Sequence, residues 1–148
     1  MEFTMAPSLL TGWTVLVVDD EPDSLFIPER LLKKCGATVL TANNGRIGLE
    51  IASELRPDFI ISDLSMPEMS GWELLKSIKN TPILSHIPVI ALTAHAMRGD
   101  RQRAMEVGFH NYLTKPLRPE TFISDVLNLL MDIPELASQL TGVKNRPV

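Results

Sequence analysis

Residues 59–63 read Phe-Ile-Ile-Ser-Asp, a short apolar run that ends in a carboxylate. A run of this length without polar alternation is typical of a strand buried on both faces, as in a parallel sheet. The chain contains four similar runs, at Val15 to Val18, Ala37 to Thr41, Val89 to Leu92 and Tyr112 to Thr114. In chain order the second and fifth runs are the most polar, which predicts that they form the edges of the sheet.

Segments with helical periodicity separate these runs. They extend from Asp23 to Cys35, from Asn43 or Asn44 to Pro57, from a capping box at Ser70 through Ile78, from Ala96 to Val107, and from Pro119 to Met131. The alternation predicts an α/β fold, a doubly wound five-stranded parallel sheet with five helices. Pro28 lies inside the first helical pattern and predicts a kink or a late, irregular start.

Composition narrows the class of protein. The chain has 148 residues and a net charge of −4, which favours one compact domain and disfavours a phosphate-backbone binder with a clustered positive surface. Cys35 is the only cysteine, so there is no disulfide framework and a reducing compartment fits. No apolar run approaches the roughly 18 residues of a membrane span, and the start lacks a signal-peptide pattern. We expect a cytoplasmic protein with no membrane insertion and no direct contact with nucleic acid.

Polar side chains that can bind a metal or take part in catalysis follow four of the predicted strands. Asp19 and Asp20 follow the first strand, Asp63 the third, Thr93 the fourth and Lys115 the fifth. Each alone is a common loop or cap residue. Since the carboxyl ends of parallel strands meet at one edge of the sheet, where ligands bind in such folds, we expect all five to converge.

Three converging carboxylates repel one another, and a hard cation relieves that repulsion. Mg²⁺ prefers oxygen ligands and commonly binds one or two carboxylates together with a phosphate oxygen. Lys115 would add a cation for phosphoryl oxygens and Thr93 a hydroxyl donor. A carboxylate can also attack phosphorus as a nucleophile. The set therefore favours Mg²⁺-assisted phosphoryl transfer.

At this point the sequence resembles a bacterial-type response-regulator receiver domain, from about Trp13 to about Met131. The resemblance rests on Val17-Val18-Asp19-Asp20-Glu21-Pro22, Asp63-Leu64-Ser65-Met66-Pro67 with Gly71, Ala91-Leu92-Thr93-Ala94, and Tyr112-Leu113-Thr114-Lys115-Pro116-Leu117. It implies a flavodoxin-like strand order of 2-1-3-4-5 and a cis Lys115–Pro116 peptide. We accordingly divide the chain into an N-terminal extension (1–12), a receiver domain (13–131) and a C-terminal tail (132–148). Separately, we interpret residues 1–4 of the extension as a cloning remnant.

The resemblance implies a role for each acidic residue. Asp63 would accept the phosphoryl group. Asp20 and Asp63 would bind Mg²⁺ through their side chains, Ser65 through its backbone carbonyl, and Asp19 mainly through a metal-bound water. Glu21, beside the acid pair, is within possible reach of the metal site, but we favour its interpretation as a solvated carboxylate.

The remaining matching positions would contact the phosphate and transmit the signal. Lys115 would contact a phosphoryl oxygen and the unphosphorylated Asp63. Thr93 would move to bond a phosphoryl oxygen, and Tyr112 would turn inward with it. These movements would favour a second arrangement of the fourth helix and fifth strand.

The implied partners are proteins. A histidine kinase or a histidine phosphotransfer protein would supply the phosphoryl group, and a downstream protein target would read the result. No enzymatic activity is expected beyond self-phosphorylation and self-dephosphorylation. A homodimer through the fourth and fifth helices stays open, because their exposed faces are not distinctive.

Three other interpretations remain. The first alternative is a receiver fragment of a hybrid histidine kinase or of a longer regulator. A Mg²⁺-dependent phosphatase of the haloacid dehalogenase type also uses a strand-end aspartate, but such enzymes carry a second aspartate two residues later, where this chain has Ser65. A flavin- or nucleotide-binding module needs a phosphate-binding first loop, and the acids from Asp19 to Asp23 would repel an anion there.

Overall fold

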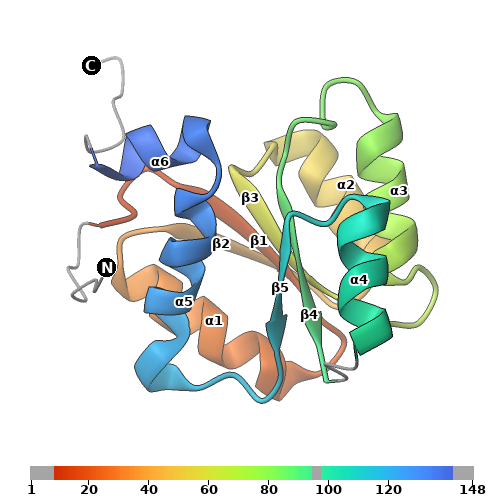
Figure 1. Cartoon of the computed structure of the whole chain (residues 1–148), viewed down its shortest axis with the longest axis horizontal. Helices are drawn as coiled ribbons and strands as arrows, with labels where there is room; N and C mark the ends of the chain where they lie inside the picture. Colours follow the sequence, from red (N-terminus) through yellow and green to blue (C-terminus); the bar gives the residue numbers. More distant parts are fainter. Residues whose placement is uncertain (1–8, 95–97, 142–148) are drawn as a thin grey trace.

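The computed structural model describes residues 9–94 and 98–141 and shows a parallel sheet between two layers of helices (Figure 1). The strands are β1 (Thr14–Val18), β2 (Thr38–Ala42), β3 (Phe59–Asp63), β4 (Val89–Thr93) and β5 (Asn111–Thr114). They pair in parallel in the order β2-β1-β3-β4-β5. The predicted order and the two polar edge strands are confirmed.

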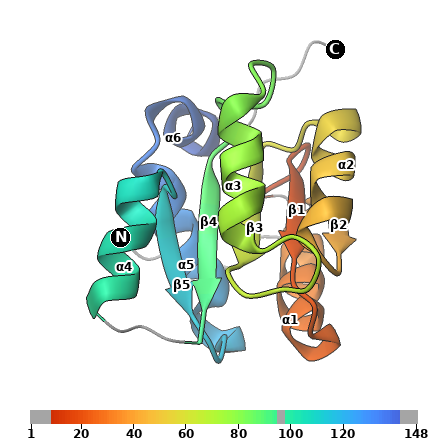
Figure 2. The ribbon, with the colours of Figure 1, turned by 90° about the vertical axis from the view of Figure 1, so that its right-hand side faces the viewer.

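Six helices occur in the described ranges. They are α1 (Pro22–Lys34), α2 (Gly45–Leu55), α3 (Gly71–Asn80), α4 (Arg98–Val107), α5 (Pro119–Met131) and α6 (Pro134–Thr141). Figures 1 and 2 show α1 and α5 on one face of the sheet and α2, α3 and α4 on the other. The doubly wound arrangement predicted from the alternation is confirmed.

The two faces of the sheet are filled by separate apolar clusters. Val15, Val17 and Ile61 point into the cluster beneath α1 and α5. Leu16 and Ile60, which alternate with them, point into the cluster beneath α2 and α3. This alternation explains why the sequence runs are continuously apolar: a central strand buried on both faces has no solvent-facing position.

Local sequence signals set the helix starts. Asn44 accepts a hydrogen bond from the backbone N–H of Ile47 at 2.9 Å, and Ser70 and Glu73 form a capping box. Pro119 stands in the first turn of α5. The five residues predicted to face inward from α5 are buried: Phe122, Ile123, Val126, Leu127 and Leu130.

Two details of the helices differ from the sequence prediction. Helix α1 begins at Pro22, whose fixed φ suits a first turn, so the predicted late start is wrong although Pro28 does lie within the helix. The predicted start of the fourth helix at Ala96 lies outside the described residues. No helix within residues 9–94 and 98–141 is both long enough and apolar enough to cross a bilayer.

The predicted count of five helices is also wrong, because α6 forms within the segment interpreted as a tail. Its Leu136 and the preceding Ile133 enter the same apolar cluster as Leu10, which precedes Trp13. The Leu10 side chain is fully buried, and its backbone N–H donates to the carbonyl of Cys35 at 2.6 Å. Apolar burial gives both segments a reason to order against the sheet.

Candidate functional site

The site lies where β1 and β3 end side by side. Val18 is paired with Ser62, so Asp19 and Asp63 come next to each other at the carboxyl edge of the sheet. The backbone N–H of Asp19 donates to the carbonyl of Ala42 at 3.0 Å, which extends the sheet pairing past β1. Both carboxylates therefore stand on rigid strand backbone, a favourable position for a catalytic group.

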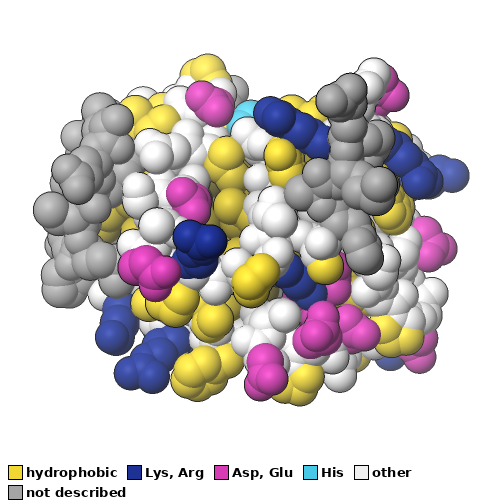
Figure 3. Space-filling view, turned by 60° about the horizontal axis from the view of Figure 1, so that its bottom comes forward, with side chains coloured by type: hydrophobic (Ala, Val, Ile, Leu, Met, Phe, Trp, Pro, Cys, Tyr) yellow, Lys and Arg dark blue, Asp and Glu magenta, His cyan; other side chains and the backbone are white. Residues whose placement is uncertain are grey.

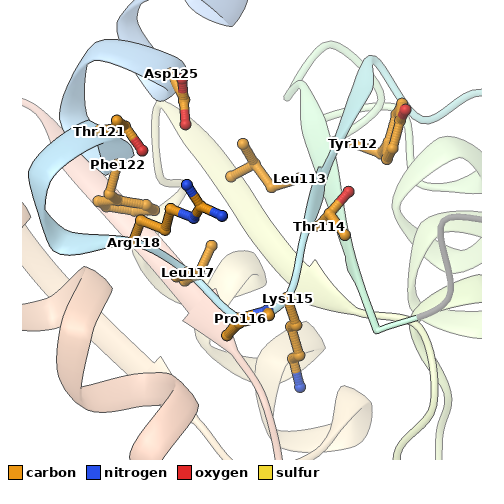
Figure 4. A pocket seen from close by; sticks show the side chains of 10 residues that line it. All are labelled: Tyr112, Leu113, Thr114, Lys115, Pro116, Leu117, Arg118, Thr121, Phe122 and Asp125. Atoms are coloured by element: carbon orange, nitrogen blue, oxygen red, sulfur yellow. The ribbon is translucent and has the colours of Figure 1, made fainter.

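Lys115 reaches this pair from the end of β5. Its backbone N–H donates to the carbonyl of Thr93 at 2.8 Å, and the peptide bond to Pro116 is cis, as the resemblance implied. Its Nζ lies 2.9 Å from Asp19 Oδ2 and 3.2 Å from Asp63 Oδ2. Figure 4 shows the Lys115 side chain directed away from the groove of about 440 Å³ between β5 and α5. Lys115 is among the residues that line this groove, while its Nζ contacts the acidic site.

A third carboxylate completes the environment of the lysine. Glu21 Oε1 lies 3.0 Å from Lys115 Nζ, and its own backbone N–H donates to Asp19 Oδ1 at 2.9 Å. The Glu21 side chain is 64% exposed, whereas that of Asp19 is fully buried. Sequence reasoning treated Glu21 as a solvated carboxylate and missed this pairing.

Burial and charge perturb the two most enclosed groups. Burial raises the pKa of Asp19 and the nearby Asp63 charge raises it further, against the hydrogen bonds from Glu21 N–H and Lys115. For Lys115 burial alone would lower the pKa, but hydrogen bonds and charge from Asp19 and Glu21 raise it above its ordinary value. Lys115 is therefore a permanent cation among carboxylates that repel one another.

The carboxylates suit a hard divalent cation. One oxygen from each of Asp19, Asp20, Glu21 and Asp63 falls within 4.8 Å of the others, and Asp19 and Asp63 are buried while Asp20 and Glu21 are exposed. Figure 3 brings this edge forward and shows acidic side chains gathered next to a basic one. An all-oxygen, partly solvent-facing set of this kind fits Mg²⁺, which keeps several water ligands.

The structure places the other predicted residues around this cluster. Thr93 ends β4 and is buried. The Ser65 backbone N–H lies 3.4 Å from Asp63 Oδ1, at the limit of a hydrogen bond. Tyr112 lies on β5, half-buried, with the Arg101 guanidinium 5.1 Å from its ring centroid. Thr93, Asp63 and Lys115 line one edge, and Tyr112 lies further back, paired with Ala91, two residues before Thr93 on β4.

Residues 15–127 match the family described as response regulator receiver domain. The chain belongs to this family. Among its relatives, the polar-differentiation response regulator DivK of Brucella anthropi is 37% identical over 119 residues, which cover 80% of this chain and 97% of DivK.

Solved receiver domains share the fold. The chemotaxis protein CheY4 of Vibrio cholerae matches with a TM-score of 0.74 and 32% identity, covering 79% of this chain and 98% of CheY4. The receiver domain of a signal transduction histidine kinase from Syntrophus aciditrophicus matches with a TM-score of 0.72 and 34% identity, covering 92% of this chain and 96% of that one. As a receiver domain, this chain is a signalling module of two-component systems.

Proposed function

We propose that this receiver domain accepts a phosphoryl group on Asp63 from the phosphohistidine of a histidine kinase or a histidine phosphotransfer protein. The arrangement that supports this proposal is Lys115 Nζ at 3.2 Å from Asp63 Oδ2. An ammonium at that distance can neutralise charge on the phosphoryl oxygens as they approach. Asp63 is also the one buried carboxylate of the cluster with a partly exposed side chain, at 10% against 0% for Asp19.

The reaction exchanges one bond for another. A carboxylate oxygen of Asp63 forms a bond to phosphorus while the bond between phosphorus and the histidine nitrogen breaks, and the electron pair leaves with the imidazole. When bound by Asp20, Asp63 and the Ser65 carbonyl, with Asp19 acting through water, Mg²⁺ supplies charge neutralisation for the phosphoryl oxygens. Lys115 needs no proton transfer to act, because its raised pKa keeps it charged.

The effect of phosphorylating Asp63 would be transmitted through β4 and β5. An aspartyl phosphate adds negative charge and strong acceptor oxygens at the Asp63 position. The Thr93 hydroxyl would donate to these oxygens, and the position of Thr93 at the end of the strand next to β3 supports this role. Tyr112 then turns inward, and α4 with β5 shifts to a second arrangement that a downstream protein recognises.

Phosphotransfer to an Asp63→Asn variant tests the acceptor assignment. A histidine kinase labelled with radioactive phosphate should label the parent protein in the presence of Mg²⁺ and leave Asp63→Asn unlabelled. Asp125→Asn, which alters an exposed carboxylate on α5, is the matched control and should label like the parent. Equal labelling of Asp63→Asn and the parent would exclude Asp63 as the acceptor.

The comparison with the Syntrophus kinase receiver supports a second context, in which this domain works as the receiver of a hybrid histidine kinase. That match covers 92% of the chain, more than the 79% covered by CheY4. It must therefore extend into segments outside residues 13–131. Phosphotransfer profiling separates the contexts, since a hybrid-kinase receiver should accept phosphate fastest from one kinase core, and a phosphorelay carrier should also pass it on to a histidine phosphotransfer protein.

A further inference from the structure

Helices α3 and α4 lie on the face of the sheet opposite α1 and α5 (Figures 1 and 2). Side chains of both helices line a groove. It has a volume of about 390 Å³. Residues from both helices line it, among them Trp72, Leu75, Lys76, Lys79, Arg103 and Val107. None of these residues belongs to the acidic site around Asp63, so the groove has no part in the proposed phosphoryl transfer.

The floor of the groove is apolar and built from fixed aromatic contacts. Trp72 meets Phe109 edge to face, with ring centroids 5.5 Å apart. The Arg103 guanidinium lies over the Trp72 ring at 4.4 Å from its centroid. Val107, at the end of α4, is 49% exposed. A stacked guanidinium keeps its in-plane N–H donors available, so Arg103 can still bind a carboxylate.

Positive charge borders this floor on both sides. Lys76 and Lys79 extend from α3 and Arg103 from α4. None of the three forms an ion pair with a carboxylate in the described part of the chain. The Lys79 stem lies near Gly108, where a Cβ would be 3.3 Å from its Cε. Three cations around one hollow, without an ion pair among the described residues, are unexpected in a protein of net charge −4.

We infer that the α3–α4 groove binds an acidic peptide segment of a partner protein, with an apolar side chain over Trp72 and Val107 and carboxylates on Lys76, Lys79 and Arg103. The apolar floor supplies the contact area and the three cations supply complementarity to carboxylates.

Charge argues for a peptide over a nucleic acid. A duplex carries a phosphate for each ~1.7 Å of its axis, which calls for a longer basic surface than one groove with three cations. The net charge of −4 would oppose such a polyanion further. A short segment with two or three carboxylates matches the number of cations, and its apolar side chain uses the floor that a phosphate backbone would leave bare.

The unphosphorylated full chain tests this inference by NMR. The probe is a peptide of about eight residues, glutamates with two leucines, and the matched peptide has glutamine for every glutamate. Trp72 reports on the groove through its indole N–H signal, and the fully buried Trp13 is an internal reference. The acidic peptide should shift the Trp72 signal and leave Trp13 unmoved, and the glutamine peptide should bind about tenfold more weakly.

Two variants with the same change of charge separate the groove from charge in general. Lys76→Gln/Lys79→Gln/Arg103→Gln should weaken binding about tenfold. Arg30→Gln/Lys33→Gln/Lys34→Gln removes three exposed cations from α1, on the other face of the sheet, and should bind like the parent. Since every altered side chain is exposed, both variants should keep the Trp13 signal of the folded protein.

Three results would overturn the inference. The first is an unmoved Trp72 signal at millimolar acidic peptide. The second is an equal loss of binding in the α1 variant, or equal binding of the glutamine peptide, because either would reduce the effect to nonspecific attraction. The third is a Trp72 shift on diluting the protein without peptide, which would assign the groove to a second copy of the chain.

Discussion

Gly71 lies against the backbone carbonyl of Asp63 so closely that a Cβ at this position would collide with the oxygen. Its own N–H donates to the carbonyl of Leu64 at 3.0 Å. The start of α3 is thus packed directly onto the strand end that carries the proposed acceptor. Because the obstructing atom is backbone, rotation of a side chain cannot relieve the collision.

Gly71→Ala should therefore destabilise the fold by about 1–3 kcal/mol and slow phosphorylation, since Asp63 must shift with its carbonyl. Gly48→Ala is the control: a Cβ there meets Val18 Cγ2 at 3.0 Å, a side-chain atom that can adjust. In the helix interior, alanine also gains roughly 1 kcal/mol over glycine, so the Gly48 variant should be near neutral. Urea unfolding and phosphotransfer rates measure both effects, and equal losses for the two variants would contradict the argument.

Most of the site was predictable, because its residues end strands and strand ends converge in a parallel sheet. Asp19, Asp20, Asp63 and Lys115 were placed together from their positions after apolar runs, and the structure brings them within contact of one another. The ion pair of Glu21 with Lys115 was not predictable, since it joins residues 94 apart through an exposed side chain. No local pattern encodes such a contact.

The fold was also predictable from the apolar runs of its strands. The prediction failed where the apolar pattern was short. The three central strands are almost continuously apolar, the two edge strands are more polar, and a helical segment separates each strand from the next. Helix α6 has eight residues, and among the described side chains Leu136 and the preceding Ile133 are the ones in the buried cluster. So brief an apolar stripe does not distinguish a docked helix from a tail until the surface that receives it is known.

The segments outside residues 13–131 should contribute to stability. Leu10 is fully buried in a cluster with Leu136, whereas Leu9 is only half-buried at its edge. Leu10→Ala should cost about 2–5 kcal/mol in the free energy of unfolding, as other buried leucines do. Leu9→Ala should cost clearly less. Denaturant unfolding measures both free energies. An unchanged free energy of unfolding in Leu10→Ala would show that residues 9–12 do not contribute to the stability of the domain.

Magnesium should stabilise the protein through the carboxylate cluster. At a Mg²⁺ concentration of about 100 times Kd, the parent should gain roughly 2.7 kcal/mol, seen as a rise in Tm that a chelator reverses. Asp20→Asn should remove most of this rise and leave the metal-free protein at least as stable, because it also removes a repelling charge.

Asp23→Asn is the matched control for the magnesium experiment. Asp23 lies in the first turn of α1, three residues from Asp20 and outside the cluster. Its variant should keep the full Mg²⁺-dependent rise in Tm. A rise of parental size in Asp20→Asn would remove Asp20 from the proposed ligands, and a reduced rise in Asp23→Asn would show that any loss of acidic charge weakens binding.

Cys35 should be unreactive in the folded protein and should make stability fall at alkaline pH. The side chain is buried, and burial raises the pKa of its thiol. The unfolded thiol ionises near pH 8.5, so its contribution to stability is complete below that pH and is lost as pH rises through the higher folded pKa. Cys35→Ala should therefore lose a constant amount of stability to the cavity at neutral pH, and the difference from the parent should shrink above about pH 9. Urea unfolding across pH 7–10 measures that difference. A stability difference that grows with pH would reverse the sign and show that the folded protein favours the thiolate.

The same burial should protect Cys35 from reaction. Alkylation by iodoacetamide should be slow until urea unfolds the chain.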